Sequence, residues 1–319
     1  MSDTLTSLRR QLDGVGKLES VVRAMKAVAA SSIGQYEAAV RALGDYERSV
    51  ALGLSVCLRD VGNAGVEKTA PDDCSIGAIV FGSDQGLVGR FNEAIVDFSL
   101  RSLAALPGQK TLWVVGERVY SQLTDAGMSV VRQFTVPSSA AAITPLVTEI
   151  QIEVEAQCAK SQYAQVYVFH NRPQSAALYE PMGQRLLPLD AQWHARLTDI
   201  QWPTSNLAEV LGGAEVTLRA LVHEHLFISL YKACAESLTS ENGSRLEAMQ
   251  RAQRNIETLC AHLKQSFNRR RQSSIDEELF DVIAGFNALS ATTPLPKHGS
   301  AGSPGTTEES ARSYNAARN

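Results

Sequence analysis

The sequence predicts an α/β protein with long helices, in which an antiparallel two-helix coiled coil from the N- and C-terminal segments carries a central Rossmann-like α/β domain. Two observations lead to this prediction. Proline-free stretches with apolar residues at steps of three and four lie near both ends of the chain, the spacing of a helix that meets one or two partners. Between them, short apolar runs alternate with helical stretches, which is typical of a parallel sheet.

Residues 1–60 are expected to form the first coiled-coil helix. The apolar seam of this segment contains no proline, and at 1.5 Å per residue the helix would measure about 80 Å. Its glycines weaken it by up to about 1 kcal/mol each relative to alanine, so the helix needs a partner. We expect the seam to comprise Leu5, Leu8, Leu12, Val15, Leu18, Val22, Met25, Ala29, Ile33, Tyr36, Val40, Leu43, Tyr46, Val50, Leu54 and Cys57.

Residues 74–200 are expected to form the central α/β domain. Apolar runs with the length of strands are separated, early in the segment, by helix-like stretches at 92–106, 117–126 and 140–160. Strand and helix in alternation predict parallel strands joined by crossover helices. The last strands follow one another without a helix, so we expect an antiparallel edge. The expected strands are 76–81, 111–115, 130–134, 165–169, 176–179 and 185–189.

Residues 205–290 are expected to form the second coiled-coil helix, because no proline interrupts the stretch from about Leu207 to Leu289. Unbroken, this helix would measure about 120 Å, with Asn242-Gly243 and Gly285 as the places where it could bend. Two helices that each carry an apolar seam can cover one another. Residues 291–319 have almost no aliphatic side chains, so we predict a disordered tail.

Composition and charge exclude several classes of protein. The net charge is −4 and the pI about 5.9, so the molecule as a whole is not a polycation for nucleic acid. Five cysteines without a C-x-x-C pair predict reduced thiols in a cytosolic compartment. The polar N-terminus lacks the apolar core of a signal peptide, and the sequence has no run of about 18 apolar residues that would predict a membrane span.

The stretch FGSDQGLVGRFN, residues 81–92, places a glycine-rich turn directly after the first expected strand. Its glycines, Gly82, Gly86 and Gly89, lack the G-x-G-x-x-G spacing of a dinucleotide loop. A P-loop would need lysine and then serine or threonine after Gly89, and arginine and phenylalanine stand there. We therefore expect no nucleotide cofactor, but a structural turn whose glycines adopt positive φ and whose Asp84 caps a helix.

The tripeptide His223-Glu224-His225 resembles a piece of a zinc site. Adjacent positions on a helix point about 100° apart, so the two histidines cannot share a metal from one helix face. We expect solvated or packed helix residues here, and no metal. No serine- or cysteine-based catalytic set has a local signature in the sequence, so we assign no catalytic residue.

The C-terminal segment carries a basic collar, defined as Arg269, Arg270 and Arg271. From Arg245 to Arg271 there are seven Lys or Arg and two Asp or Glu. This arrangement suggests docking against charged partners, with a solvated charged face as the alternative. Nucleic-acid binding is not expected, because aromatic stacking residues do not accompany the arginines. An acidic band follows the collar, formed by Asp276, Glu277, Glu278 and Asp281.

Three blocks of the sequence, taken in order, resemble the gamma subunit of F-type ATP synthases. They are VVRAMKAVAAS at 21–31, GSDQGLVGRFN at 82–92 and SFNRRRQSSIDEEL at 266–279. The family has A-M-K-x-V-A-A-S in its first helix, S-D-x-G-L-x-G-x-x-N after its first strand, and Y-N-x-x-R-Q-x-x-I-T-x-E-L near its C-terminus. The resemblance extends over about residues 1–290.

The resemblance implies a rotor shaft without an active site of its own. In the family, the terminal helices form a coiled coil inside a ring of three alpha and three beta subunits, and the α/β domain meets epsilon and the c-ring of the membrane sector. The subunit couples ion flow to ATP synthesis or hydrolysis on beta. The implied location is the cytoplasmic side of a bacterial inner membrane, as a peripheral protein that reaches the membrane only through the complex.

Site residues follow from the resemblance by position. Arg23, Met25 and Lys26 on the first helix fall at family positions that face the ring. So do Arg271 and Gln272 on the second helix.

The sequence also departs from the family. Ser32-Ile33-Gly34 stand where basic residues are usual, and Arg269 and Arg270 are expected to restore part of that charge. Asp276 and Glu277 replace Thr and Gln, Arg90 stands at a usual glycine position, and the chain continues about 30 residues past the usual end.

Two other classes stay open at this point. A coiled-coil scaffold with a basic collar would form a stable homo-oligomer. A small α/β enzyme with helical arms would show a convergent polar site at the carboxyl ends of its strands.

Overall fold

The computed structural model describes residues 4–61, 75–161, 165–175, 178–188 and 213–291, together with 195, 197, 199–200, 202–206 and 208–211. The chain divides into two compact units, one of Arg10–His262 and one of Met1–Arg9 with Leu263–Asn319. Residues 292–319, which contain almost all of the predicted tail, lie outside the described residues. The predicted boundaries of the four segments stay predictions.

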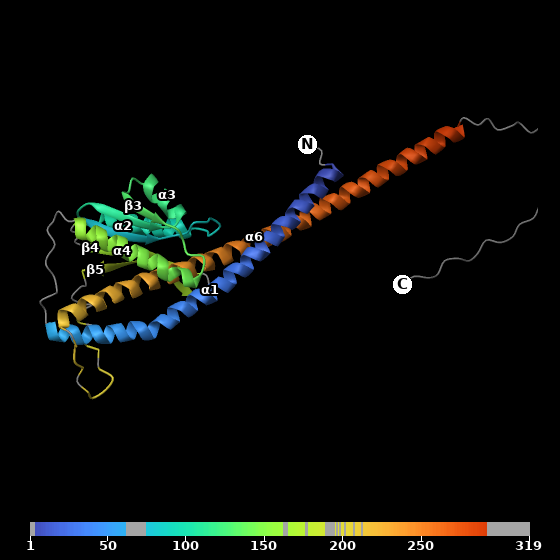
Figure 1. Cartoon of the computed structure of the whole chain (residues 1–319). Helices are drawn as coiled ribbons and strands as arrows, with labels where there is room; N and C mark the ends of the chain where they lie inside the picture. The colour runs from blue at the N-terminus through green and yellow to red at the C-terminus, as the bar shows by residue number, and fades with distance from the viewer. Residues whose placement is uncertain are drawn as a thin grey trace, which may run out of the picture. The chain divides into compact units, whose positions relative to one another are not determined.

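A five-stranded sheet lies at the centre of the Arg10–His262 unit (Figure 1). The strand order is β3-β2-β1-β4-β5, in which β1 pairs in parallel with β2 and β4, and β2 with β3. The last pair, β4 and β5, is antiparallel, which confirms the expected edge. The strands are β1 (Ile76–Phe81), β2 (Lys110–Val115), β3 (Val130–Phe134), β4 (Gln165–Ser175) and β5 (Leu178–Leu187).

Helices cover both faces of the sheet, and its central strands are therefore buried on both sides. Ala78 and Val80 of β1 pack in one apolar cluster with α2 (Phe91–Ala104) and α3 (Glu117–Asp125). Ile79 and Phe81 point the opposite way, into a cluster with α4 (Ile143–Ser161) and α6 (Ala214–Ala291). A short 3₁₀ helix, η2 (Ala140–Ala142), precedes α4. The alternation follows from the two-residue period of a strand.

Two long helices, α1 (Leu5–Val61) and α6 (Ala214–Ala291), are the terminal elements. Within the Arg10–His262 unit they run antiparallel. Lys26 Nζ donates to Gln253 Oε1 at 3.3 Å, and farther along α1 Glu47 pairs with Lys232 at 3.5 Å. Asn242 does not interrupt α6; its side-chain amide donates to the carbonyl of Leu238 at 2.8 Å. The predicted fold class is confirmed.

The buried positions of α1 follow a seven-residue repeat, which favours a left-handed supercoil. This register corrects part of the expected seam. Leu18 and Tyr46 are 57% and 42% exposed, and the neighbouring Glu19 and Glu47 are half-buried in their place. Long charged side chains can lay their methylene stems along a seam while their heads reach solvent. The repeat comprises Leu12, Glu19, Lys26, Ile33, Val40, Glu47 and Leu54 in one row, and Val15, Val22, Ala29, Tyr36, Leu43, Val50 and Cys57 in the other.

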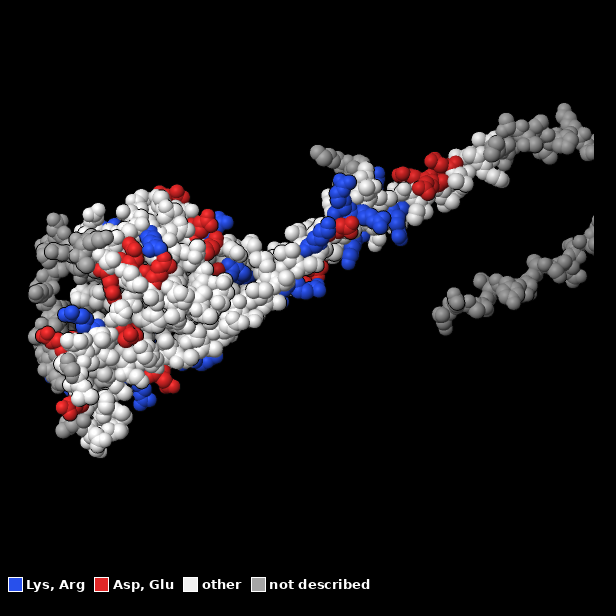
Figure 2. Space-filling model, viewed as in Figure 1, with Lys and Arg blue, Asp and Glu red and all other residues white. Residues whose placement is uncertain are grey.

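The Leu263–Asn319 part of the second unit is helical as far as Ala291. The basic collar and the acidic band lie on this stretch in the order expected, and all of their residues are exposed (Figure 2). Apolar side chains of the acidic stretch are exposed as well, among them Leu279 and Phe286 at 56% and 69%. Within the described residues, no helix combines the length and apolarity needed to cross a membrane.

Candidate functional site

The glycine-rich turn after β1 has a different backbone from the one expected. Positive φ occurs at Gly89 (59°) and also at Leu87 (63°), whereas Gly82 and Gly86 do not adopt it. The expectation that all three glycines supply positive φ is therefore wrong. A buried exchange of hydrogen bonds holds the turn, since Ser83 N donates to Asn92 Oδ1 at 3.1 Å and Asn92 Nδ2 donates to Ser83 Oγ at 2.9 Å.

Gly82 is required by close packing. A Cβ at this position would lie 2.1 Å from Cγ2 of Val119 on α3 and 3.2 Å from Asn92 Oδ1. A contact of 2.1 Å is far inside van der Waals distance, so alanine cannot fit unless α3 moves. Gly86 has open space around it, with Arg118 as its nearest neighbour at 3.9 Å.

Asp84 is not the N-cap residue of the helix that follows the turn, and its carboxylate instead bonds to the first turn of a helix distant in sequence. Its Oδ1 accepts from the backbone N–H of Glu117 at 3.0 Å, at the first residue of α3. Its Oδ2 accepts from the N–H of Val136 at 2.9 Å. The helix that follows the turn, α2, has Arg90 at its N-cap and no side-chain cap. Asp84 thus ties together three segments that are distant in sequence.

The order of the strands along the sheet reverses between β1 and β4, and α6 forms hydrogen bonds next to this switch point. In doubly wound folds, ligands lie in the crevice at the carboxyl ends of the strands on either side of such a switch. Here Ser240 Oγ donates to the carbonyl of Asn171 at 2.9 Å, and Ser244 Oγ donates to the carbonyl of Val88. Asn171 in turn donates to the carbonyl of Phe91 at 2.9 Å. We call these contacts the junction.

A buried ion pair extends the junction toward α1. Glu241 Oε1 accepts from Arg245 Nη2 at 2.6 Å, and the two side chains are 7% and 12% exposed. Desolvation raises the pKa of the Glu241 carboxyl; Arg245 opposes the shift and Asp84 adds to it. Burial, followed by the charge of Glu241, raises the pKa of Tyr36 on α1. Loss of one ionic partner would leave a buried charge uncompensated.

Sequence reasoning missed this set of α6 residues. Each is polar, and they recur at the helical spacing of three and four, but Thr239 and Asn242 between them are polar as well. The sequence alone therefore does not distinguish this buried face from a solvated one. The set comprises Ser237, Ser240, Glu241, Ser244 and Arg245.

In the tripeptide His223-Glu224-His225, the first residue is exposed and the other two are half-buried, so both expected alternatives, solvated and packed, occur. His223 Nδ1 lies 2.8 Å from Glu155 Oε1 on α4. Glu224 accepts from the hydroxyl of Tyr46 on α1 at 2.6 Å. Desolvation lowers the pKa of His225, and the charge of Glu47 opposes the shift. The tripeptide links α6 to two helices at once.

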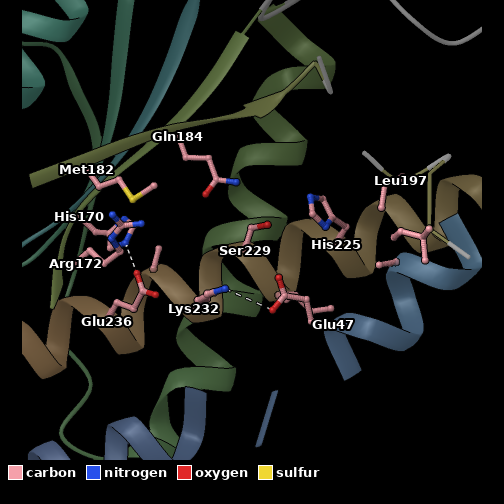
Figure 3. Close-up of a pocket in the computed structure, with 14 residues that line it drawn as sticks. Glu47, His170, Arg172, Met182, Gln184, Leu197, His225, Ser229, Lys232 and Glu236 are labelled. Atoms are coloured by element: carbon pink, nitrogen blue, oxygen red, sulfur yellow. Dashed lines mark hydrogen bonds and ion pairs between the residues drawn. The ribbon is translucent and has the colours of Figure 1, made fainter. Parts of the chain in front are cut away.

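His225 lines a cavity of about 360 Å³ between α1, α6 and the β4–β5 hairpin (Figure 3). Two polar pairs among its lining residues join different elements. His170 on β4 contacts Glu236 on α6 at 2.8 Å, and Lys232 pairs with Glu47. Residues 75–161 and the other described ranges contain no group of three or more metal-binding side chains.

The ring-facing residues expected on α1 have two different environments. Arg23 is 74% exposed at its side chain and pairs with Glu19 at 2.7 Å, one turn back on the same helix. Met25 and Lys26 are half-buried, and Lys26 donates to Gln253 of α6. On α6, the collar and Gln272 are exposed. That these residues face a surrounding ring stays a prediction.

Of the cysteines that the structure describes, Cys234 and Cys260 are free thiols. Cys57 and Cys234 are buried and Cys260 is half-buried. Desolvation, followed by the charge of Glu241, raises the pKa of the Cys234 thiol, which makes it a packed and unreactive group. The side chains of Cys74 and Cys158 lie outside the described residues.

Comparison with known proteins decides the family. A family model described as ATP synthase matches residues 4–289. The chain belongs to this family. Among curated relatives, the ATP synthase gamma chain of Polaromonas sp. strain JS666 is 26% identical over 88% of this chain and 98% of its own length. The gamma chain of Frankia casuarinae is 27% identical, over 92% and 100%. The recognition of a gamma subunit is confirmed.

Solved structures agree with the fold. A chain of the Euglena gracilis mitochondrial ATP synthase, from an OSCP/F1/c-ring structure, matches with a TM-score of 0.62 at 17% identity, over 92% of this chain and 98% of the other. A chain of the Tetrahymena thermophila central stalk and c-ring structure matches with a TM-score of 0.55 at 24% identity, over 73% and 99%. The family match and the gamma-chain relatives support the expected central-stalk rotor subunit over both alternatives.

Proposed function

We propose that this gamma-type chain turns as the shaft of an F-type ATP synthase or ATPase and couples ion flow through a membrane sector to ATP synthesis or hydrolysis on an alpha/beta hexamer. The observation that carries the proposal is the junction. A shaft transmits torque only if its helices and the central α/β domain, here called the foot domain, move as one body. Buried polar contacts bond α6 to β4 on one side of the switch point and to the turn after β1 on the other.

The paired helices supply the stiffness that this role needs. Side chains that interlock at seven-residue spacing resist twisting of one helix against the other. Contacts between helices add to the packing, among them the hydrogen bond from Lys26 to Gln253 and the ion pair of Glu47 with Lys232. Exposed pairs of this kind are worth about 1 kcal/mol or less each, so the buried seam and the junction dominate.

Coupling requires that each shaft angle favours one set of beta conformations. We assign the contact with the ring to Arg23, Met25 and Lys26 on α1 and to Arg269, Arg270, Arg271 and Gln272 on α6. An exposed basic collar suits moderate, reversible attraction to acidic loops. Because Lys26 already bonds to α6, we expect it to contribute less to the ring contact than Arg23.

The foot domain is assigned to the remaining partners. We propose that it meets epsilon and the c-ring, and that the chain lies at the cytoplasmic side of a bacterial inner membrane through these partners. The glycine turn is assigned a structural part in the foot, and no nucleotide, metal or catalytic residue is assigned to the chain.

Co-expression with the cognate alpha and beta subunits tests the proposal. The expected result is a stable assembly that hydrolyses ATP, while the isolated chain neither hydrolyses ATP nor binds Mg-ATP in calorimetric titration. A homo-oligomer that excludes alpha and beta would favour the scaffold alternative. A micromolar Mg-ATP site on the isolated chain would contradict the structural assignment of the glycine turn.

A further inference from the structure

A second cavity, of about 270 Å³, lies beside the junction, between α1, the glycine turn, the segment after β3 and α6. Glu241 lines it with 5% of its surface exposed. Glu241 Oε1 accepts from Arg245, but its Oε2 is buried and has no hydrogen-bond partner among the described residues. A carboxylate oxygen removed from water without a partner is costly, so the cavity is the place for a group that would satisfy it.

The charges around the cavity are unbalanced. Asp84 and Glu241 supply two carboxyl groups, and Arg245 is the one Lys or Arg among the described lining residues. The carboxylate of Asp84 is held by two backbone N–H groups, which leaves its formal charge in place. A single added positive charge would offset the desolvation of Glu241 and its repulsion by Asp84.

The shape of the cavity favours a side chain over a free metal ion. Part of its wall is apolar, with Val28 (65% exposed), Val136 and Pro137. Lysine and arginine lay apolar stems along such walls while their heads reach polar groups. A hard metal ion needs six or more oxygen ligands, and the described residues contain no group of three or more candidate metal ligands.

We propose that this cavity receives one lysine or arginine side chain of a partner subunit, whose charged head pairs with Glu241. The side chain enters along the Val28 face of α1. The site fixes one rotational register between the chain and that partner, because a buried pair has a single geometry. The inference rests on the proposed function for the identity of the partner, a subunit of the alpha/beta assembly.

Proximity cross-linking in the assembled complex tests the site. The Ser32→Cys variant places a thiol in the lining, and a short thiol-to-amine reagent then captures any lysine within reach; mass spectrometry identifies the linked peptide. The Ser31→Cys variant is the matched control, because residue 31 is exposed on the same helix and does not line the cavity. We expect linkage to one partner lysine from position 32, and at least fivefold less from position 31.

Charge variants carry the second readout. Glu241→Gln keeps the shape and the hydrogen bond to Arg245, and should weaken binding to the alpha/beta assembly about tenfold, as loss of a desolvated charge pair does. Arg245→Gln removes the competing cation and should leave the linkage yield equal or higher. Tryptophan fluorescence, to which the buried Trp113 contributes, and thermal midpoints verify that both variants fold. If the partner residue is an arginine, the cross-linking reagent captures no amine. The test is then the weaker binding of Glu241→Gln to the alpha/beta assembly, together with a shallower dependence of that binding on salt concentration.

The outcomes separate this inference from the proposed function. Failure to assemble with alpha and beta overturns both. An intact assembly in which Glu241→Gln binds unchanged overturns the cation site alone. Saturable stabilisation of the isolated chain by KCl that Glu241→Gln abolishes assigns the site to an inorganic ion and overturns the partner assignment.

Discussion

Replacement of Asp84 by alanine should loosen the foot domain by an amount that the structure lets us estimate. The carboxylate accepts from Glu117 N at 3.0 Å and from Val136 N at 2.9 Å. Loss of the exposed cap on α3 costs about 1 kcal/mol, and an unsatisfied, partly buried N–H of Val136 costs about 1 to 2 kcal/mol. We therefore expect Asp84→Ala to lower the free energy of unfolding by about 2 to 3 kcal/mol.

Urea unfolding followed by tryptophan fluorescence, to which the buried Trp113 contributes, measures this difference. Asp84→Asn keeps one acceptor oxygen and should cost about half as much. Asp97→Ala, at an exposed position of α2, is the matched control and should change stability by less than about 0.5 kcal/mol. An Asp84→Ala variant as stable as the Asp97→Ala control would refute the conclusion that one carboxylate holds the three segments together.

Three further predictions concern packing, pH and coupling. Gly82→Ala should lower the free energy of unfolding by about 1 to 3 kcal/mol through overpacking, and by less in a chain that also carries Val119→Ala. An equal loss in both chains, measured by urea unfolding, would exclude the contact between residues 82 and 119 as the cause. Because desolvation lowers the pKa of His225 below its usual 6.5, protons favour the unfolded chain, so stability is lost as pH falls below about 6.5. His225→Gln should flatten thermal midpoints between pH 7 and 5, and a slope equal to wild type would contradict this. Alanine at all three collar positions, 269–271, should lower ATP-driven ion pumping relative to ATP hydrolysis in reconstituted vesicles with little change in stability. Unchanged pumping would show that the collar is a solvated charged face without a part in coupling.

The architecture was predictable because it depends on local periodicity. Apolar steps of three and four predict the pairing of α1 with α6, and strand–helix alternation predicts the parallel sheet with its antiparallel edge. Which residue occupies each seam position was less predictable. Glu19 and Glu47 replace the apolar neighbours Leu18 and Tyr46, since register depends on the supercoil as well as on hydrophobicity.

The junction depends on contacts between residues far apart in sequence, and its partners could not be predicted. Asp84 was expected to cap a helix, but nothing local to the turn indicates that the helix is α3, 33 residues away. Ser240 and Ser244 bond to backbone carbonyls of β4 and of the turn. Such pairings are set by how the sheet and α6 pack together, and the mostly polar sequence of this part of α6 would also fit a solvated face.

Rotation itself is the most direct test of the account. The alpha/beta assembly is fixed to a surface, a rod is attached through a single cysteine on the foot domain, and the rod is followed by microscopy in Mg-ATP. The account predicts sustained rotation in one direction that stops when ATP is withdrawn. A chain that assembles with alpha and beta and supports ATP hydrolysis while the rod stays at one angle would contradict it.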